Sequence, residues 1–371
     1  MQSKTMKGIF AISGILTIVG VASWALSLSS SRNLGMTDYV SWGLVIAGFL
    51  ALEAVAAGAL FFACFGKDRS LRKKLVSISL ASTVACVVAI VYDLGTLGPF
   101  WRLFFAPHFQ APMALDVWFF SLAIILGALY LFALAKNKDR MIAVFSKISL
   151  IVAVLMPLGT SILFTTVVGR VGWSSPLEVA IFELCALVTG VCLLAFFSKD
   201  DTEKRRHQLL TLLLGSYAFL IVAEIVQSAY TTGFSFSNVL ELMTGSYAWM
   251  FWIWLIGGIL LPLVLLVLRR SQKLVAGLTI AGMILGKYVF IIKGSLFAYT
   301  AQGIGMTVPS MTTTTNGQTI APIYIPGIAE WGMFIGSIAL AVLLTTLLIL
   351  VADKKNQAAV PAADSDCTME A

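Results

Sequence analysis

Charge is scarce in this sequence. Only 12% of the 371 residues are Asp, Glu, Lys or Arg, whereas a soluble domain carries roughly a quarter. A chain with so few charges cannot cover a water-facing surface of ordinary polarity, which excludes a soluble enzyme. The hydrophobic share of 59% and the mean hydropathy of +0.94 predict an integral membrane protein instead.

Histidine and closely paired cysteine are scarce as well. The chain has two histidines, His108 and His207, and five cysteines. No two cysteines have the CxxC spacing that is typical of zinc or iron–sulfur ligands. A haem held between helices would need both histidines, and His207 lies in a basic segment. We therefore expect no haem and no metal in this chain.

Long apolar runs are abundant. A bilayer core of about 30 Å requires about 20 apolar residues of helix, and ten segments qualify. They predict an all-α integral membrane protein with about ten transmembrane helices, as a single membrane domain over residues 1–352. The polar segment 353–371 is expected to be a disordered cytoplasmic tail. The predicted spans are 8–29, 40–65, 75–95, 114–135, 148–169, 177–197, 208–231, 247–268, 274–298 and 329–351.

Lysine and arginine are distributed unevenly around these spans. Of the 25, 20 fall on the N-terminus, on the C-terminal tail and on every second loop, and only Arg32, Arg102 and Arg170 fall on the other side. Positive residues concentrate on the cytoplasmic side of membrane proteins. Both termini are therefore expected in the cytoplasm. The net charge of +7 is explained by orientation, without a nucleic-acid partner.

Six ionisable residues lie inside the predicted spans, where a charge costs several kcal/mol. All except Glu53 and Lys287 fall in the outer half, which favours a polar site near the outer surface. The alternative is a set of buried ion pairs that fix helix packing. The six residues are Glu53, Asp93, Glu183, Glu224, Lys287 and Lys293.

Three further acids stand at the starts of predicted helices. Asp116 and Glu330 begin the fourth and tenth spans, and Glu178 begins the sixth. An acid in the first turn of a helix complements the helix dipole. This explanation competes with a functional one for Asp116 and Glu330, and Glu178 is assigned no role.

The spacing of the acids suggests an internal duplication. Glu53 and Asp93 are 40 residues apart on spans two and three, and Glu183 and Glu224 are 41 apart on spans six and seven. Spans two and six run in the same direction through the membrane. The pattern predicts two four-helix bundles, formed by helices 2–5 and 6–9 and flanked by helices 1 and 10.

Several spans carry distinctive motifs. The second reads WGLVIAGFLALEAVAAGALFF from Trp42, and its small AAGA segment permits close helix contact. The third leads into YDLGTLGPFWRLFFAPHFQAPMALDVWFF, from Tyr92 to Phe120. Later spans contain WIWLIGGILLP, LGKYVFIIKG and YIPGIAEWG. Over roughly residues 40 to 350 these motifs resemble the NrfD/polysulfide-reductase membrane-subunit family, and the ten spans resemble its larger branch.

The resemblance implies a membrane subunit without a redox cofactor of its own, in the inner (cytoplasmic) membrane of a prokaryote. It would exchange electrons between a menaquinone or ubiquinone pool and an extracytoplasmic partner, an iron–sulfur ferredoxin-like or haem subunit. A further catalytic subunit, with molybdopterin or several haems, would complete the complex. Proton translocation could accompany electron transfer.

Quinone chemistry moves two protons with two electrons, so acid/base groups are expected near the ring. Asp93 and His108 are the first candidates for this catalytic role. Tyr92, Trp101, Arg102 and Asp116 would surround the quinone. Glu53, Glu183, Glu224 and Lys287 would relay protons. The family's usual SPM is APM here, at Ala111, and the fifth span carries Thr160 and Ser161 where related proteins often have a histidine.

Two other functions fit part of the pattern. Ten spans with midplane charges and a possible repeat also suit a secondary transporter, whose broken helices could lie at Pro157 or at Gly257–Pro262. A purely structural anchor for a redox partner would explain the spans without quinone binding. The acids within the membrane count against that last interpretation.

Overall fold

The computed structural model describes most of the chain: residues 2–29, 34–36, 40–66, 68–94, 98, 102–105, 111–197, 202–231, 235–296, 312–313, 319–320 and 323–358. Within these residues, ten helices are long and apolar enough to cross a membrane, which confirms the predicted number. Nine of the ten are α1 (Gln2–Ser29), α2 (Leu44–Phe65), α3 (Arg69–Asp93), α5 (Pro112–Ala135), α6 (Asp139–Thr165), α7 (Leu177–Phe197), α8 (Glu203–Tyr230), α12 (Gln272–Leu296) and α13 (Ile328–Ala358).

The remaining span consists of three consecutive pieces. They are α10 (Ala248–Trp252), the π-helical segment η3 (Ile253–Leu260) and α11 (Leu261–Val267). Pro262 has no N–H for the ladder, and its ring crowds the carbonyl four residues earlier. The wider π turns directly before Pro262 are a usual response to such an interruption. The helix nevertheless continues through the span.

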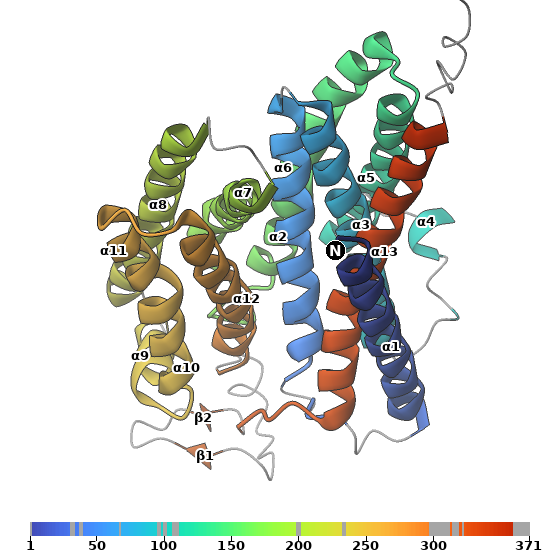
Figure 1. The fold of residues 1–371 in the computed structure, drawn as a ribbon. Helices are drawn as coiled ribbons and strands as arrows, with labels where there is room; N and C mark the ends of the chain where they lie inside the picture. Colours follow the sequence, from blue (N-terminus) through green and yellow to red (C-terminus); the bar gives the residue numbers. More distant parts are fainter. Residues whose placement is uncertain are drawn as a thin grey trace, which may run out of the picture.

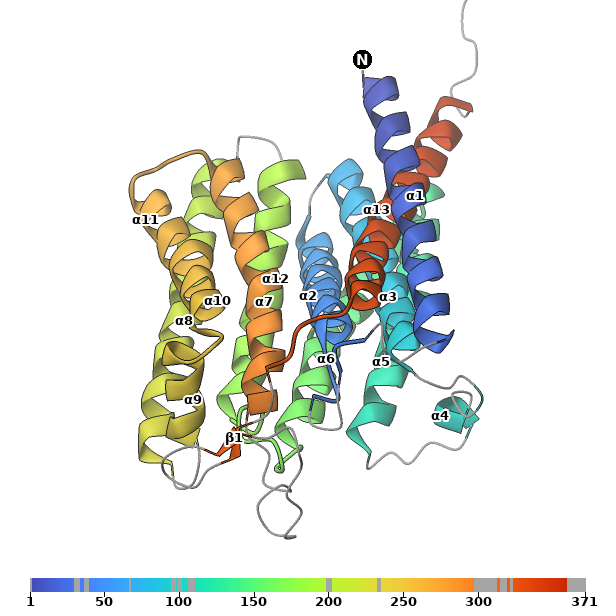
Figure 2. The ribbon, with the colours of Figure 1, turned by 90° about the horizontal axis from the view of Figure 1, so that it is seen from below.

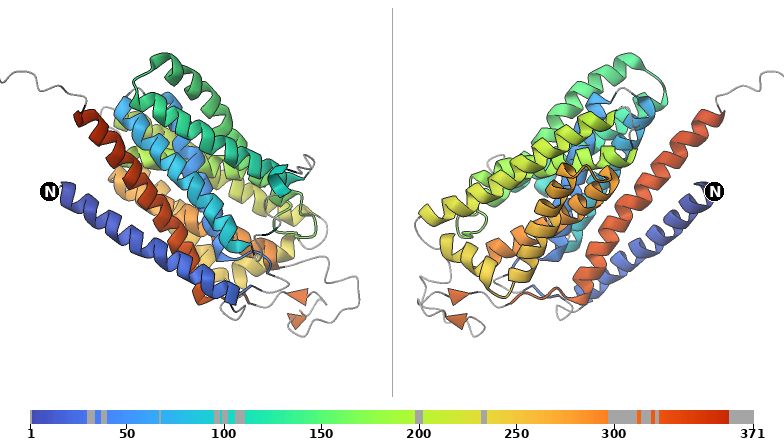
Figure 3. Two further views of the ribbon diagram at one scale, coloured as in Figure 1. Left: turned by 90° about the vertical axis from the view of Figure 1, so that its right-hand side faces the viewer. Right: turned by 60° about the vertical axis from the view of Figure 1, so that its left-hand side comes forward.

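The ten spans form two bundles, as predicted (Figure 1). Helices α2, α3, α5 and α6 make the first. Helices α7, α8, α12 and the span α10–η3–α11 make the second, where the short helix α9 (Ser235–Thr244) also packs. Figures 2 and 3 show α1 and α13 side by side along the first bundle. Two short elements complete the structure: helix α4 (Arg102–Phe105) and a hairpin of β1 (Thr312–Thr313) and β2 (Thr319–Ile320).

Helix α2 is the centre of the molecule. It packs against α3 and α6 of its own bundle, against α7 and α12 of the other, and against α13. Its small residues allow this crowding. A Cβ added to Gly58 would lie 2.1 Å from the Ala186 carbonyl oxygen, and one added to Gly190 would lie 2.6 Å from the Gly58 carbonyl oxygen. The AAGA segment thus brings the backbones of α2 and α7 together and joins the two bundles.

Several helices extend beyond the predicted spans. Helix α3 begins at Arg69 rather than near residue 75, and α6 begins at Asp139 rather than near residue 148. Charged first turns project past the apolar slab, so hydropathy alone does not detect them. Helix α13 continues to Ala358, into the segment expected as a tail, and residues 359–371 lie outside the described part of the chain.

We name the two ends of the bundles by their residues. The basic end is the one where α2 ends and α3 begins, near Arg69, and the opposite end is the one where α3 ends at Asp93.

The contact between α2 and α7 gives a stability prediction. Gly58→Ala should lower the free energy of unfolding by about 1–3 kcal/mol, because the added methyl group overpacks a backbone contact. Gly215→Ala on α8 is the matched control, since a Cβ there meets nothing within 4 Å. Thermal unfolding in detergent, followed by tryptophan fluorescence, compares the two variants. Equal midpoints for both would contradict the close packing.

Candidate functional site

Two carboxyl groups meet one hydroxyl inside the first bundle. Thr160 on α6 donates its hydroxyl hydrogen to Glu53 Oε1 on α2 at 2.6 Å. The same oxygen lies 3.2 Å from Asp116 Oδ1 on α5. All three residues are buried, at 0%, 1% and 4% exposure for Thr160, Glu53 and Asp116. The lack of a side chain at Gly159 leaves room for Asp116, because a Cβ there would lie 2.7 Å from its carboxyl oxygen.

This arrangement constrains the protons. A threonine hydroxyl has a single hydrogen and can donate it to one acceptor only. When Thr160 donates to Glu53, the Asp116 contact is a hydrogen bond only if Asp116 carries a proton and donates it, and the reverse holds as well. Both contacts are therefore hydrogen bonds only when one of the two carboxyl groups carries a proton.

A second cluster lies in the second bundle. The Lys293 ammonium on α12 donates to Glu178 Oε1 on α7 at 2.5 Å and to Glu224 Oε1 on α8 at 2.7 Å. Asn238 on α9 donates to the Lys293 carbonyl at 2.9 Å. We call Lys293, Glu178 and Glu224 the ion triad. If one of the two carboxyl groups takes up a proton, the Lys293 ammonium still has the other carboxylate as its partner.

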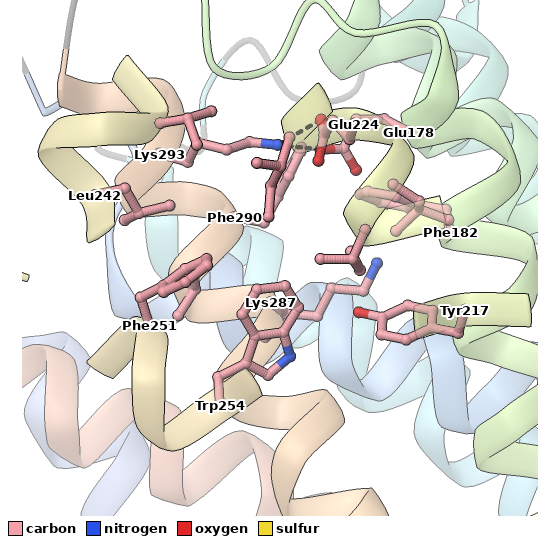
Figure 4. A pocket seen from close by; sticks show the side chains of 16 residues that line it. Glu178, Phe182, Tyr217, Glu224, Leu242, Phe251, Trp254, Lys287, Phe290 and Lys293 are labelled. Atoms are coloured by element: carbon pink, nitrogen blue, oxygen red, sulfur yellow. Dashed lines mark hydrogen bonds and ion pairs between the residues drawn. The ribbon is translucent and has the colours of Figure 1, made fainter. Parts of the chain in front are cut away.

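Lys287 lies on α12, as Lys293 does, but it is not a member of the triad. Its ammonium is 3.1 Å from the centroid of the Phe182 ring, a cation–π contact. Figure 4 shows the Lys287 ammonium and the Tyr217 hydroxyl facing the same space, with the ion triad above them. A cavity of about 40 Å³ opens there, large enough for water. Lys287 also interacts electrostatically with Glu183 and with Glu53 of the first bundle.

The predicted catalytic region is only partly within the described residues. Asp93 is the last residue of α3, and its Oδ1 atom is buried without a hydrogen-bond partner among the described residues. Tyr92 is buried, and its ring lies 5.9 Å from that of Trp24 on α1. Arg102 is exposed on the short helix α4. His108 and Trp101 lie outside the described residues.

The structure thus divides the predicted site residues among several groups. Glu53 and Asp116 share Thr160, whereas Glu224 pairs with Lys293. Asp93 interacts electrostatically with Glu330 at the start of α13. Glu183 has a buried Oε1 atom with no hydrogen-bond partner in the described segments. The roles assigned to these residues remain predictions.

Sequence reasoning missed Glu178. Its position in the first turn of α7 suggested only a helix-dipole role, yet it is 2% exposed and bonded to Lys293. A signal existed: a lysine inside a span requires a buried counter-charge at a similar depth. Choosing among the acids at that depth requires knowing that α7 and α8 both face α12.

These features define a polytopic helical-bundle membrane protein with buried acid–base groups in both bundles. No group of three or more His, Cys, Asp or Glu side chains suited to a metal ion occurs among the residues that the structure describes. The family described as "Polysulphide reductase, NrfD" matches residues 32–299. The chain belongs to this family, as its motifs suggested.

Relatives from three organisms match most of the chain. A putative membrane subunit of dimethyl sulfoxide reductase, from Halobacterium salinarum, is 25% identical over 91% of this chain and 89% of its own length. A selenate reductase subunit from Mesobacillus selenatarsenatis is 22% identical, over 94% and 95%. An Hdr-like menaquinol oxidoreductase integral membrane subunit from Archaeoglobus fulgidus is 22% identical, over 89% and 88%.

A solved structure has a similar arrangement of helices. The match is to a chain of bd oxidase from Geobacillus thermodenitrificans, with a TM-score of 0.50 and 15% sequence identity. It covers 91% of this chain and 97% of that chain. The likeness concerns the fold alone.

The ion triad gives a second prediction. Lys293→Met should lower the free energy of unfolding by about 3–5 kcal/mol, because it leaves two buried carboxyl groups without their cation. Adding Glu178→Gln and Glu224→Gln should restore much of the loss. Thermal unfolding of the purified protein measures both effects.

The control for the triad is an exposed ion pair. Arg69 and Asp139 contact each other with side-chain exposures of 47% and 77%, and such pairs contribute about 0–1 kcal/mol. Arg69→Met should therefore change the midpoint little. A Lys293→Met variant as stable as Arg69→Met would show that the triad does not hold the second bundle.

Proposed function

We propose that this protein is the quinone-reactive membrane subunit of a multi-subunit respiratory oxidoreductase. It exchanges electrons between a menaquinone or ubiquinone pool and an iron–sulfur ferredoxin-like or haem subunit. A catalytic subunit with molybdopterin or several haems completes the complex. The observation that carries this proposal is the set of buried carboxyl, ammonium and hydroxyl groups in a member of the NrfD family.

The named relatives support the oxidoreductase part. They are described as a membrane subunit of dimethyl sulfoxide reductase, a subunit of selenate reductase and an integral membrane subunit of a menaquinol oxidoreductase. The named activities differ, whereas each relative matches this membrane chain over most of its length. This pattern fits a shared quinone reaction in the membrane subunit and a variable reaction in the partners.

The chemistry requires proton acceptors in the membrane. A quinol that is oxidised gives two electrons to the partner subunit and two protons to nearby bases, and quinone reduction reverses both transfers. Asp93 is the first proposed base, and its buried Oδ1 atom at the opposite end of α3, which has no hydrogen-bond partner among the described residues, supports this role. His108 is the second proposed base. Tyr92, Trp101 and Arg102 would lie beside the ring.

Two groups of residues would carry protons away from that region. Glu53, Thr160 and Asp116 would share a proton in the first bundle. Lys287 interacts electrostatically with both Glu53 and Glu183. Glu224 belongs to the ion triad. Coupling to proton translocation would use these groups together with water.

The charge distribution supports one orientation. The basic end of the bundles carries nearly all the Lys and Arg residues outside the spans, which supports a position of this end in the cytoplasm, with the spans in a prokaryotic inner membrane. The opposite end, with Asp93 and Arg102, would then face the extracytoplasmic partner. Both termini would be cytoplasmic.

The transporter alternative has less structural support. It expects helices that break at the binding site. Helix α6 passes through Pro157 without interruption, and the span Ala248–Val267 is helical throughout.

The third prediction tests the proposed function in the native complex. The complex is purified in mild detergent, its co-purifying chains are identified, and it is titrated with a menaquinol analogue. Asp93→Asn should lower quinol-linked activity about 100-fold or more, the usual contribution of a general acid/base group. Asp139→Asn makes the same chemical change at the basic end and should leave the activity unchanged.

The outcomes separate the alternatives. Iron–sulfur or haem partners, with activity lost only in Asp93→Asn, would support the proposal. Quinol-linked activity that survives Asp93→Asn would remove Asp93 from the mechanism. A lone chain with no response to quinol would overturn the proposed function and favour the transporter.

A further inference from the structure

A large cavity lies away from all the predicted site residues. Its volume is about 450 Å³, against about 40 Å³ for the cavity beside Lys287. Helices α10 and α12 form one side of it, and the extended segment 323–327 and the start of α13 form the other. Figure 1 shows this segment leading into α13 at the opposite end of the bundles.

The cavity walls are mostly aromatic. Tyr247, Tyr288 and Tyr324 line it together with Trp249, Trp331 and Phe334. The Tyr288 and Tyr324 ring centroids are 6.3 Å apart. Flat side chains on several sides suit a flat ring, which gains from offset or edge contacts with them. The volume is within the about 300–1,000 Å³ of typical small-molecule sites.

The side chains at the mouth of the cavity are exposed and apolar, as expected of a surface that faces lipid. Trp249 is 63% exposed, Trp331 48% and Ile325 72%. Exposed tryptophans near the ends of spans are typical of the membrane interface. A molecule that enters here would come from the bilayer, so it must be soluble in lipid.

Two tyrosine hydroxyls in the wall are already bonded within the protein. Tyr324 donates to Glu330 Oε1 at 2.5 Å and accepts from the Leu44 N–H at 2.8 Å. The Tyr247 hydroxyl contacts the backbone of Tyr324. Burial, and after it the Glu330 carboxylate, raises the pKa of the Tyr324 hydroxyl, so this group stays a hydrogen-bond donor.

The third hydroxyl is different. Within the described part of the chain, the half-buried Tyr288 has no hydrogen-bond partner for its hydroxyl. It can therefore donate to, or accept from, an oxygen on a bound ring. An acyl chain has no oxygen to use this hydroxyl and gains little from flat aromatic walls.

Glu330 connects the cavity to Asp93. One oxygen of its buried carboxylate accepts from Tyr324, and the other accepts from the N–H groups of Gly35 and Gly327 at 2.6 and 2.8 Å. The negative charges of Glu330 and Asp93 repel each other, so these two carboxyl groups interact electrostatically. The proposed proton acceptor Asp93 is thus within electrostatic range of the carboxyl group that bonds to the cavity wall.

We propose that the ring of a lipid-soluble quinone or quinol binds in this cavity between α10, α12 and α13, with the Tyr288 hydroxyl bonded to a ring oxygen. This inference rests on the proposed function, but it assigns the ring to this cavity in place of the position beside Tyr92, Trp101 and Arg102 that the motifs indicated. Tyr288 orients the ring, and Trp249 and Trp331 flank the route from the bilayer.

The experiment combines affinity with labelling. In the native complex, Tyr288→Phe should raise the KM for a menaquinol analogue about threefold to tenfold, the effect of one lost neutral hydrogen bond. Ala281→Trp places an indole in the cavity and should raise the KM further. A photoreactive azidoquinone should label peptides from α10 and α12 in the wild type and not in Ala281→Trp.

Ala128→Trp is the matched control, because Ala128 is an exposed mid-helix position on α5. It should leave the KM and the labelling unchanged, which shows that a tryptophan on a lipid-facing helix is tolerated. Normal KM values in Tyr288→Phe and Ala281→Trp, with labelling near Tyr92 to Asp116, would overturn this inference and leave the proposed function standing. A wild-type complex that neither oxidises quinol nor takes up the label would overturn both this inference and the proposed function.

Discussion

The cost of placing charge inside a bilayer governs this structure. An ionised side chain at that depth must find a partner or carry a proton. The protein uses both solutions. In the second bundle Lys293 binds two carboxyl groups directly. In the first bundle Glu53 and Asp116 have no cation in hydrogen-bonding contact among the described residues, and they meet through the single hydrogen of Thr160 instead. Apolar residues would fill both places at lower cost. The presence of these groups in the interior of both bundles fits the proton-handling role that we propose for them.

The helix packing determines which groups can meet. Gly58 and Gly190 let α2 and α7 approach closely, and this contact brings the two bundles together. Glu53 then points from α2 into its own bundle, while Phe182 on α7 lies under the Lys287 ammonium of α12. Lys287 interacts with carboxyl groups of both bundles across this junction. A change in the spacing of α2 and α7 would alter packing and electrostatics together. Under the proposed function, stability and proton movement would therefore not be independent properties of the molecule.

The fold was largely predictable, and the site was not. Span number and bundle membership follow from apolar length and alternating charge, which are local properties of the sequence. The starts of α3 and α6 were misplaced because their first turns are charged, and hydropathy measures only the apolar slab. The ionisable residues were also identifiable one by one. Their partners were not, because Glu178 and Lys293 are separated by 115 residues and meet only when α7 and α12 pack. The motif around Asp93 indicated a region, but it gave no information on a cavity lined by residues from α10, α12 and α13.

The large cavity and the region around Glu330 differ in their physical properties. The cavity is aromatic, its mouth is apolar and exposed, and the Tyr288 hydroxyl has no hydrogen-bond partner in the described segments, so the cavity suits a neutral ring that diffuses in the membrane. The region behind it is polar and closed, since the Glu330 carboxylate accepts three hydrogen bonds and has 0% exposure. In the proposed binding mode a ring would lie beside Tyr324, whose hydroxyl donates to Glu330, while Asp93 interacts with Glu330 electrostatically. Such a separation is what quinone chemistry at a membrane surface requires: the apolar substrate and the protons must leave by different routes. Under this proposal the wall between the two routes is the segment 323–327 with the first turn of α13, and Glu330, whose hydrogen bonds stabilise this wall, would connect its two sides.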